Sequence, residues 1–137
     1  MSKNTWQKKL LCIAVTIAMA VMFIPMMAFA EGNIAEVDGT GYTTVQEAIN
    51  NGNGKTVKLL AEVSENVTVA EGTTVTLDLN GFKITNASGS HTITNKGTLT
   101  IQGSGTVDNI THACAALWND GTAVLNGGTF DRSKDAG

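Results

Sequence analysis

Cysteine, proline and positive charge are all scarce in this chain of 137 residues. Its two cysteines are Cys12, in an apolar N-terminal run, and Cys114, so no disulfide can form within the part that follows the run. We expect Cys114 to be a small buried hydrophobe rather than a reactive thiol, because no basic neighbour favours its thiolate. The single proline, beside 15 glycines and many threonines and asparagines, favours short strands joined by tight turns.

The shortage of positive charge limits the partners of the chain. Three of its nine basic residues, Lys3, Lys8 and Lys9, lie near the N-terminus, where there is no acidic residue. Without residues 1–30 the chain has 107 residues and a net charge of −6. This balance argues against a nucleic-acid partner, and the length suits one domain with a modest core.

Residues 1–30 have the pattern of a secretory signal peptide, with a basic start followed by an apolar run. The run ends in Ala28-Phe29-Ala30, whose small alternate residues predict cleavage before Glu31. The alternative is an uncleaved membrane anchor, because the run approaches the ~20 residues that span a bilayer, although Pro25 disfavours it. We therefore predict a secreted, extracellular protein, with association to the cell wall as a further expectation, that meets the membrane only through this leader before cleavage.

Residues 31–43 read as a polar lead-in, and residues 44–137 as a helix followed by repeated strands. Thr44 and Glu47 have the spacing of a capping box, in which each side chain binds a free amide at the start of the helix. Gly52 is expected to end the helix in the left-handed conformation. One apolar face follows from the spacing of Val45, Ala48 and Ile49.

From Thr56 onward the apolar period changes from 3.6 to 2, which predicts short, half-buried strands. The chain also repeats itself, since residues 95–107 align with residues 119–130 with a single deletion and a period of 24. The aligned pairs are Asn95 with Asn119, Gly97 with Gly121, Thr98 with Thr122, Ile101 with Leu125, Gly103 with Gly127, and Val107 with Phe130. Residues 71–81 are a more diverged copy. This repeat predicts a parallel β-solenoid with a ladder of asparagines, while an open or sandwiched antiparallel sheet is the alternative.

The segments DGTGYTTVQEAI, TVKLL, VTLDLNG and GTLTI resemble the N-terminal part of the pectate-lyase-like right-handed parallel β-helices. They are especially similar to the adhesin-like surface proteins of Gram-positive gut bacteria, and the resemblance covers nearly all of residues 34–131. It implies an all-β fold whose short amphipathic helix plugs the N-terminal end of the coil. It is specific for fold and weak for activity, because the same coil carries lyases, hydrolases, esterases and binding proteins.

After Phe130 the pattern provides no helix or polar cap for the last coil. Such an end would leave strand edges ready to pair, and terminal coils normally need a cap. We therefore expect these residues to be the N-terminal fragment of a longer protein.

Residues with catalytic or metal-binding chemistry are sparse. The available aspartates are expected to be solvated or turn-forming, with no two of them sharing a site; they are Asp78, Asp108, Asp120 and Asp131. His91 and His112 lack further metal-ligand residues at the spacing of a metal site. His112 and Cys114 stand two residues apart, but any two such residues on a strand share a face, so their spacing alone does not indicate a thiol–imidazole pair. We expect no catalytic residue, cofactor or metal in this part of the chain.

Trp118 is the one candidate ligand-binding residue. It aligns with Thr94, beside the inward position shared by Ile93 and Leu117, so it should point outward, where an indole can stack on a sugar ring. The alternatives are that an inserted loop covers it or that it is a scattered surface aromatic. Tyr42 is expected to pack beside the helix.

These patterns favour a non-catalytic secreted or cell-surface β-helix with an adhesin-like role. Its expected partner is an extracellular polysaccharide, or a glycan of the host or cell wall. One rival is a polysaccharide lyase or glycoside hydrolase whose active site lies beyond residue 137. Another is a structural spacer with no ligand.

Overall fold

The computed structural model describes residues 32–111 and 113–135. Residues Gly32–Gly137 form one compact unit. The predicted leader, with its cleavage site at Ala28, Ala30 and Glu31, lies outside the described residues. The description below is therefore that of the strand-rich unit alone.

The unit begins with a β-hairpin, in a stretch where the sequence suggested only a polar lead-in. Strand β1 (Ala35–Val37) pairs antiparallel with β2 (Thr40–Tyr42) across a two-residue turn. Asp38 and Gly39 have φ angles of 50° and 80°, so both central residues of the turn are left-handed. Such a turn matches the twist of the flanking strands. On its other side β1 pairs antiparallel with β3, and Tyr42 packs on the core as predicted.

The helix α2 (Val45–Asn51) buries the predicted apolar face, made of Val45, Ala48 and Ile49. One of the two bonds of the predicted capping box is present at its first turn, where the Thr44 hydroxyl accepts the amide of Glu47 at 3.1 Å. The carboxylate of Glu65, distant in sequence, accepts the amides of Val45 and Gln46, each at 2.9 Å. A side chain from the first coil therefore completes the cap.

The predicted left-handed end of this helix is wrong. Gly52 has φ −102° and ψ 19°, and its amide bonds to the carbonyl of Ile49. A Cβ there would lie 2.8 Å from the Ala48 carbonyl oxygen and 2.9 Å from a Val57 methyl carbon. Glycine is therefore required at this point for close packing, and the left-handed residue is Gly54, at φ 74°.

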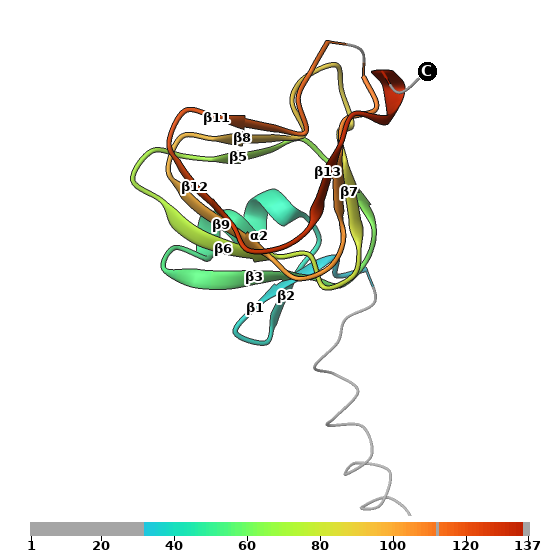
Figure 1. Cartoon of the computed structure of the whole chain (residues 1–137). Helices are drawn as coiled ribbons and strands as arrows, with labels where there is room; N and C mark the ends of the chain where they lie inside the picture. The colour runs from blue at the N-terminus through green and yellow to red at the C-terminus, as the bar shows by residue number, and fades with distance from the viewer. Residues whose placement is uncertain (1–31, 112, 136–137) are drawn as a thin grey trace, which may run out of the picture. The chain divides into compact units, whose positions relative to one another are not determined.

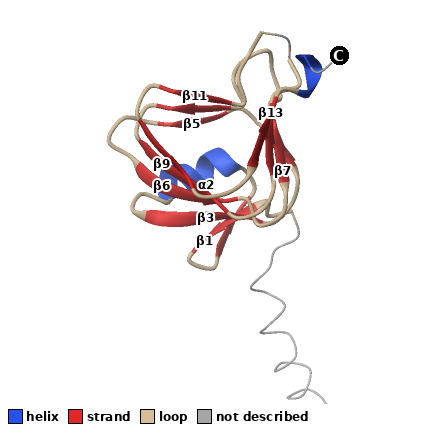
Figure 2. Cartoon of the chain, viewed as in Figure 1, coloured by secondary structure: helices blue, strands red, loops and turns tan. Residues whose placement is uncertain are grey.

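The remaining strands wind into a parallel β-helix of three flat faces, as Figures 1 and 2 show. In Figure 1 the chain turns anticlockwise as it approaches the viewer, so the coil is right-handed. Face A contains β3 (Lys55–Leu59), β6 (Thr74–Asp78), β9 (Thr98–Gln102) and β12 (Thr122–Leu125). Face B contains β4 (Val63–Ser64), β7 (Lys83–Thr85), β10 (Thr106–Asp108) and β13 (Thr129–Asp131). Face C contains β5 (Val67–Val69), β8 (Ile93–Asn95) and β11 (Leu117–Asn119), and a 3₁₀ turn, η2 (Ser133–Asp135), follows β13. The fold class predicted from the repeat is confirmed.

Strand register follows the repeat residue by residue. Face A pairs Ile101 with Leu125 and face B pairs Val107 with Phe130. Inward residues therefore form apolar columns, and residues such as Leu77 and Ile101 have no exposed surface. Each added coil extends the same columns, so the core grows along the axis of the solenoid.

The predicted asparagine ladder is present at the corner between faces C and A. The Asn95 amide donates to Asn119 Oδ1 at 2.7 Å and to the Thr122 carbonyl at 2.8 Å. Beside it, Gly97 and Gly121 stack directly, since a Cβ on Gly121 would lie 2.1 Å from the Gly97 carbonyl oxygen. Glycine recurs here because the backbones of successive coils touch at this corner.

The two ends of the solenoid differ. At the first end, α2 packs into the core and β1 covers the edge of β3. The Gln46 side chain also pairs with the backbone of β5, accepting the Thr68 amide at 2.8 Å and donating to its carbonyl at 2.9 Å. The opposite end is formed by the outer edges of β11, β12 and β13, which we call the open end. Within the described part of the chain no strand pairs with these edges.

Candidate functional site

Trp118 lies on the outer side of face C, where the repeat placed it. It pairs with Thr94 in register, while the adjacent Leu117 pairs with the inward Ile93. Thr94 pairs in turn with Thr68, so Trp118 replaces a threonine in an outward column. The residue is 47% exposed, which leaves part of the indole accessible to solvent. The outward direction of Trp118 is thus confirmed, while its role as a ligand-binding residue stays a prediction.

His91 supports the indole of Trp118 from the neighbouring coil. The two rings stack with their centroids 4.8 Å apart and their planes inclined by 21°. His91 Nδ1 accepts the backbone amide of Ala115 at 2.9 Å, so a neutral ring carries its proton on Nε2. The hydrogen bond holds the imidazole in place and the imidazole holds the indole. We call these two residues the aromatic platform.

The repeat accounts for one half of this arrangement. His91 stands 24 residues before Ala115, which is one repeat, and the hydrogen bond joins these equivalent positions, whereas the stack with Trp118 joins residues that are not equivalent in the repeat. In the sequence we weighed His91 only as a metal ligand, and a stacking role was missed. His112 lies outside the described residues.

The corner beside the platform carries two loops that project from the coil, between β7 and β8 and between β10 and β11 (Figure 1). Asparagines tie these loops to the body. Asn66 Oδ1 accepts the amides of Ala87 and Ser88, at 3.0 and 2.9 Å. Asn86 donates to Thr111 Oγ1, and its Oδ1 accepts the amide of Ile110 at 2.8 Å.

The third asparagine of this corner binds backbone on several sides. Asn109 has no exposed surface, and its amide donates to the carbonyls of Ser90 and Ala115 at 2.9 and 3.1 Å. Its Oδ1 accepts the amide of Thr111 at 3.0 Å. Asn66, Asn86 and Asn109 stand in Asn-x-Thr/Ser triplets, and their side chains serve to fix the loops beside the aromatic platform.

One aspartate departs from its expected solvated state. The Asp108 side chain has no exposed surface, and its Oδ2 lies 2.8 Å from Nζ of Lys83, which is 43% exposed. Its Oδ1 accepts the amide of Ser133 at 3.0 Å. Burial raises the pKa of Asp108, but the Lys83 ammonium and the Ser133 amide outweigh it and hold the pKa below its usual value. The same ion pair raises the pKa of Lys83.

The next strand of face B carries a second aspartate beside this ion pair. Asp108 on β10 lies in register beside Asp131 on β13. Both carboxylates are engaged locally, since Asp131 Oδ1 accepts the amide of Arg132 at 2.8 Å. The arrangement stabilises the turn after β13, because Asp108 is closed off from solvent and bound to that turn.

The other aspartates keep the predicted roles. Asp78 Oδ1 accepts the amide of Asn80 at 2.9 Å, as in a turn, and Asp120 is exposed at the corner before Gly121. Cys114 is half-buried rather than buried, with its Sγ 3.5 Å from the Gly89 carbonyl oxygen. Among the described residues there is no group of three or more His, Cys, Asp and Glu side chains that could hold a metal ion.

The comparisons with known proteins add no further constraint. The chain matches no family model, no curated protein and no solved structure. Within residues 32–111 and 113–135, no helix is long and apolar enough to cross a membrane.

Proposed function

We propose that the chain is a secreted or cell-surface β-helix of adhesin-like character, and that the aromatic platform contacts an extracellular polysaccharide or a glycan of the host or cell wall. The observation that supports this most directly is the exposed, ring-supported indole of Trp118. Sugar rings present C–H groups that pack on an aromatic face, so an indole fixed in position suits them. The leader predicted at residues 1–30 and the resemblance to adhesin-like, pectate-lyase-like coils favour the same conclusion.

The platform has properties that a scattered surface aromatic would lack. His91 and Trp118 hold each other by stacking, and the Ala115 amide holds His91, so little side-chain freedom remains to be lost on binding. Below Trp118 the outward column continues as Thr94 and Thr68. Their hydroxyl groups can both donate and accept hydrogen bonds with sugar hydroxyls.

Glycan binding is tested on an array of plant, host and bacterial polysaccharides with the unit Gly32–Gly137, which contains the whole buried core. We expect Trp118→Ala to abolish binding. Ile110→Ala is the matched control, because Ile110 is also 47% exposed but lies outside the platform. Equal binding by the wild type and Trp118→Ala would contradict the proposal and leave the spacer role in its place.

A further inference from the structure

The His91 imidazole joins the loop between β10 and β11 to the aromatic platform. Its Nδ1 atom accepts the amide of Ala115, near the end of that loop, and its ring stacks on the indole of Trp118. The Ala115 carbonyl is bound as well, by the Thr92 amide and by the Asn109 side-chain amide, each at 3.1 Å. One side chain therefore supports both the indole and the peptide group that closes the loop.

The bond to Ala115 requires an uncharged imidazole. A backbone N–H can only donate, so Nδ1 presents its lone pair and the proton of the neutral ring is on Nε2. A protonated imidazole carries an N–H group on each nitrogen and has no acceptor left. Protonation of His91 would therefore set two donors against each other across the present 2.9 Å and break this bond.

The charged groups around His91 have other partners or follow the platform strands. Cys114, in the same loop as Ala115, has its Sγ 3.5 Å from the Gly89 carbonyl oxygen. The remaining charged groups on the elements packed on the ring are Glu65, bound to the amides of α2, Asp108, paired with Lys83, and Lys96 and Asp120, which follow β8 and β11. Among the described residues no ion pair joins His91 to a carboxylate. A protonated ring is therefore attracted to the π face of Trp118 and gains no acidic partner there.

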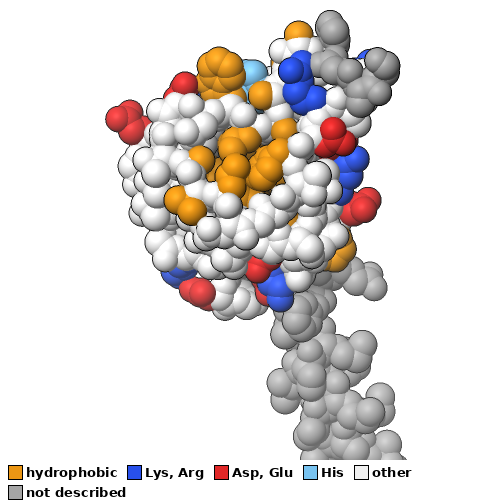
Figure 3. Space-filling model, in the orientation of Figure 1, with side chains coloured by type: hydrophobic (Ala, Val, Ile, Leu, Met, Phe, Trp, Pro, Cys, Tyr) orange, Lys and Arg blue, Asp and Glu red, His pale blue; other side chains and the backbone are white. Residues whose placement is uncertain are grey.

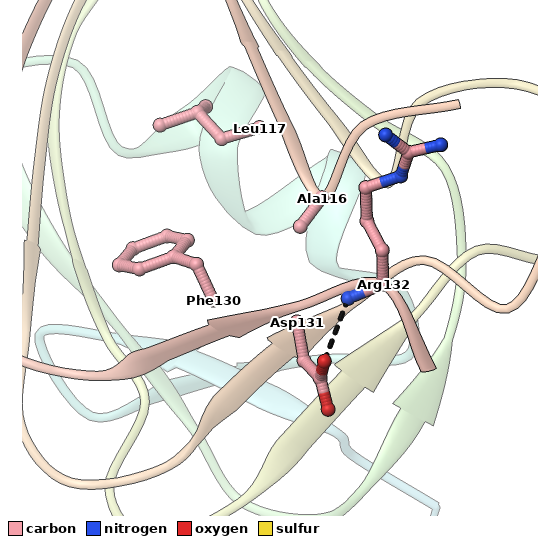
Figure 4. Close-up of a pocket in the computed structure, with 5 residues that line it drawn as sticks. All are labelled: Ala116, Leu117, Phe130, Asp131 and Arg132. Atoms are coloured by element: carbon pink, nitrogen blue, oxygen red, sulfur yellow. Dashed lines mark hydrogen bonds between the residues drawn. The ribbon is translucent and has the colours of Figure 1, made fainter. Parts of the chain in front are cut away.

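Loss of the bond to Ala115 would open the loop without unfolding β11. The next two residues hold the start of this strand, since Ala116 belongs to the core and Leu117 packs against it. Figure 4 shows Leu117 projecting into the interior of the coil. The Ala116 carbonyl also accepts the Ile93 amide at 2.9 Å, which ties β11 to β8. The change is therefore confined to the loop and to the platform.

A positive charge against the indole also weakens what its exposed side can bind. The C–H groups of a sugar carry partial positive charge and are attracted to the negative π face. An imidazolium is attracted to the same π electrons and competes for them. His91 is half-buried, and Figure 3 shows a histidine in pale blue beside hydrophobic side chains at this surface, so solvent protons reach the ring.

We propose that His91 makes the aromatic platform sensitive to pH. With a neutral imidazole the loop is bound to the coil and the platform binds its glycan. With a protonated imidazole the bond to Ala115 breaks, the loop opens and glycan binding weakens. Histidines change charge between about pH 5 and 8, which sets the range to be tested. The weakening of glycan binding rests on the proposed function, whereas the opening of the loop does not.

The test uses the unit Gly32–Gly137, in which Trp118 is the one tryptophan, so its fluorescence reports on the platform without a ligand. We expect its emission to change in a single titration between about pH 8 and 5, because a charge then appears beside the indole. The protection of the Ala115 amide against hydrogen exchange, corrected for the intrinsic effect of pH, should fall at least fivefold over the same range.

Two variants assign the change to one ring. His91→Asn cannot titrate but places an acceptor oxygen near the position of Nδ1, so the emission and the Ala115 protection should both become independent of pH. His112→Gln is the matched control, because it removes the other histidine of the unit and should leave both changes as in the wild type.

The uncharged polysaccharides of the glycan array, probed at pH 8 and at pH 5, test the effect on binding. Wild-type signals should fall at least tenfold at the lower pH, and those of His91→Asn should not. A Trp118 emission that does not titrate, or that titrates equally in His91→Asn, would overturn the proposal, and so would wild-type array signals that are equal at the two pH values. An array without signal at either pH would contradict the proposed function, while the emission and the Ala115 amide would still decide whether the loop responds to protonation.

Discussion

Replacing Asn95 with alanine should destabilise the coil more than any other single truncation of a polar side chain in the asparagine ladder. Asn95 has no exposed surface. Its amide makes two bonds, to Asn119 and to the Thr122 carbonyl, and its Oδ1 accepts the Gly97 amide at 3.2 Å. All three bonds are lost in Asn95→Ala. A buried polar group that loses its partner destabilises the fold by about 1–3 kcal/mol, which is more than the net contribution of a hydrogen bond to stability.

The magnitude follows from how exposed each partner is. Asn119 is exposed and can turn to water, so its lost bond costs little. Thr122 is exposed as well, so the half-buried Gly97 amide is the partner whose lost bond counts most. It predicts a loss of about 1–2 kcal/mol in the free energy of unfolding. For a unit of this size that loss lowers the melting temperature by roughly 5–15 °C. Urea unfolding of the unit Gly32–Gly137, followed by circular dichroism, measures the change in the free energy of unfolding.

Asn119→Ala is the matched control, because Asn119 occupies the same ladder position one coil later. Its amide donates to the Gly121 carbonyl of its own turn at 3.0 Å, and its Oδ1 accepts one N–H of Asn95 at 2.7 Å. Because Asn119 is exposed, water can replace this acceptor in Asn119→Ala, and we expect a loss of less than about 1 kcal/mol. If Asn95→Ala and Asn119→Ala lowered the free energy of unfolding by the same amount, burial of Asn95 would not explain the stability of the ladder.

Three further changes test other parts of the structure. Gly97→Ala puts a Cβ 2.3 Å from the Thr73 carbonyl oxygen and should cost about 3 kcal/mol or more in thermal unfolding, whereas Gly89→Ala, with 3.6 Å to its nearest atom, should cost almost nothing. Glu65→Ala removes two bonds from the start of α2 and should cost about 1–2 kcal/mol, visible as faster hydrogen exchange of the Val45 and Gln46 amides. Because the folded pKa of Asp108 lies below the usual 3.8, its carboxylate stabilises the fold above that value, and this contribution is lost as the pH falls through the lower folded pKa. The difference in stability between the wild type and Asp108→Asn should therefore be constant above about pH 4 and shrink progressively as the pH falls below it, as acid unfolding curves will show.

Sequence predicted the repeated part of the fold well, because each coil has to present the same residue types at the same positions. The pairs Asn95 with Asn119 and Ile101 with Leu125 lie in register as the 24-residue period requires. The period works because glycine and asparagine at the corners allow close stacking, and inward apolar residues can only be buried by the neighbouring coil. The capping-box spacing of Thr44 and Glu47 likewise predicted the start of α2.

Features that occur once were harder to predict. The hairpin of β1 and β2 was missed, although Asp38-Gly39 between two short apolar stretches is a hairpin turn sequence. The cap formed by Glu65 and the pairing of Gln46 with Thr68 depend on how the helix docks. Such contacts join residues about 20 positions apart with no period to reveal them.

The residues that break the repeat distinguish this coil from a purely structural solenoid. Trp118 stands where Thr94 and Thr68 occupy the same outward column, and His91 supports it from the coil below. Bulk at an outward position does nothing for the core, so packing alone does not explain the tryptophan. The loops beside it are held by asparagines that bond to backbone from several coils, which fixes this corner although it lies outside the apolar interior. An irregular, rigid and partly exposed corner on an otherwise regular solenoid is therefore the place at which recognition should first be sought.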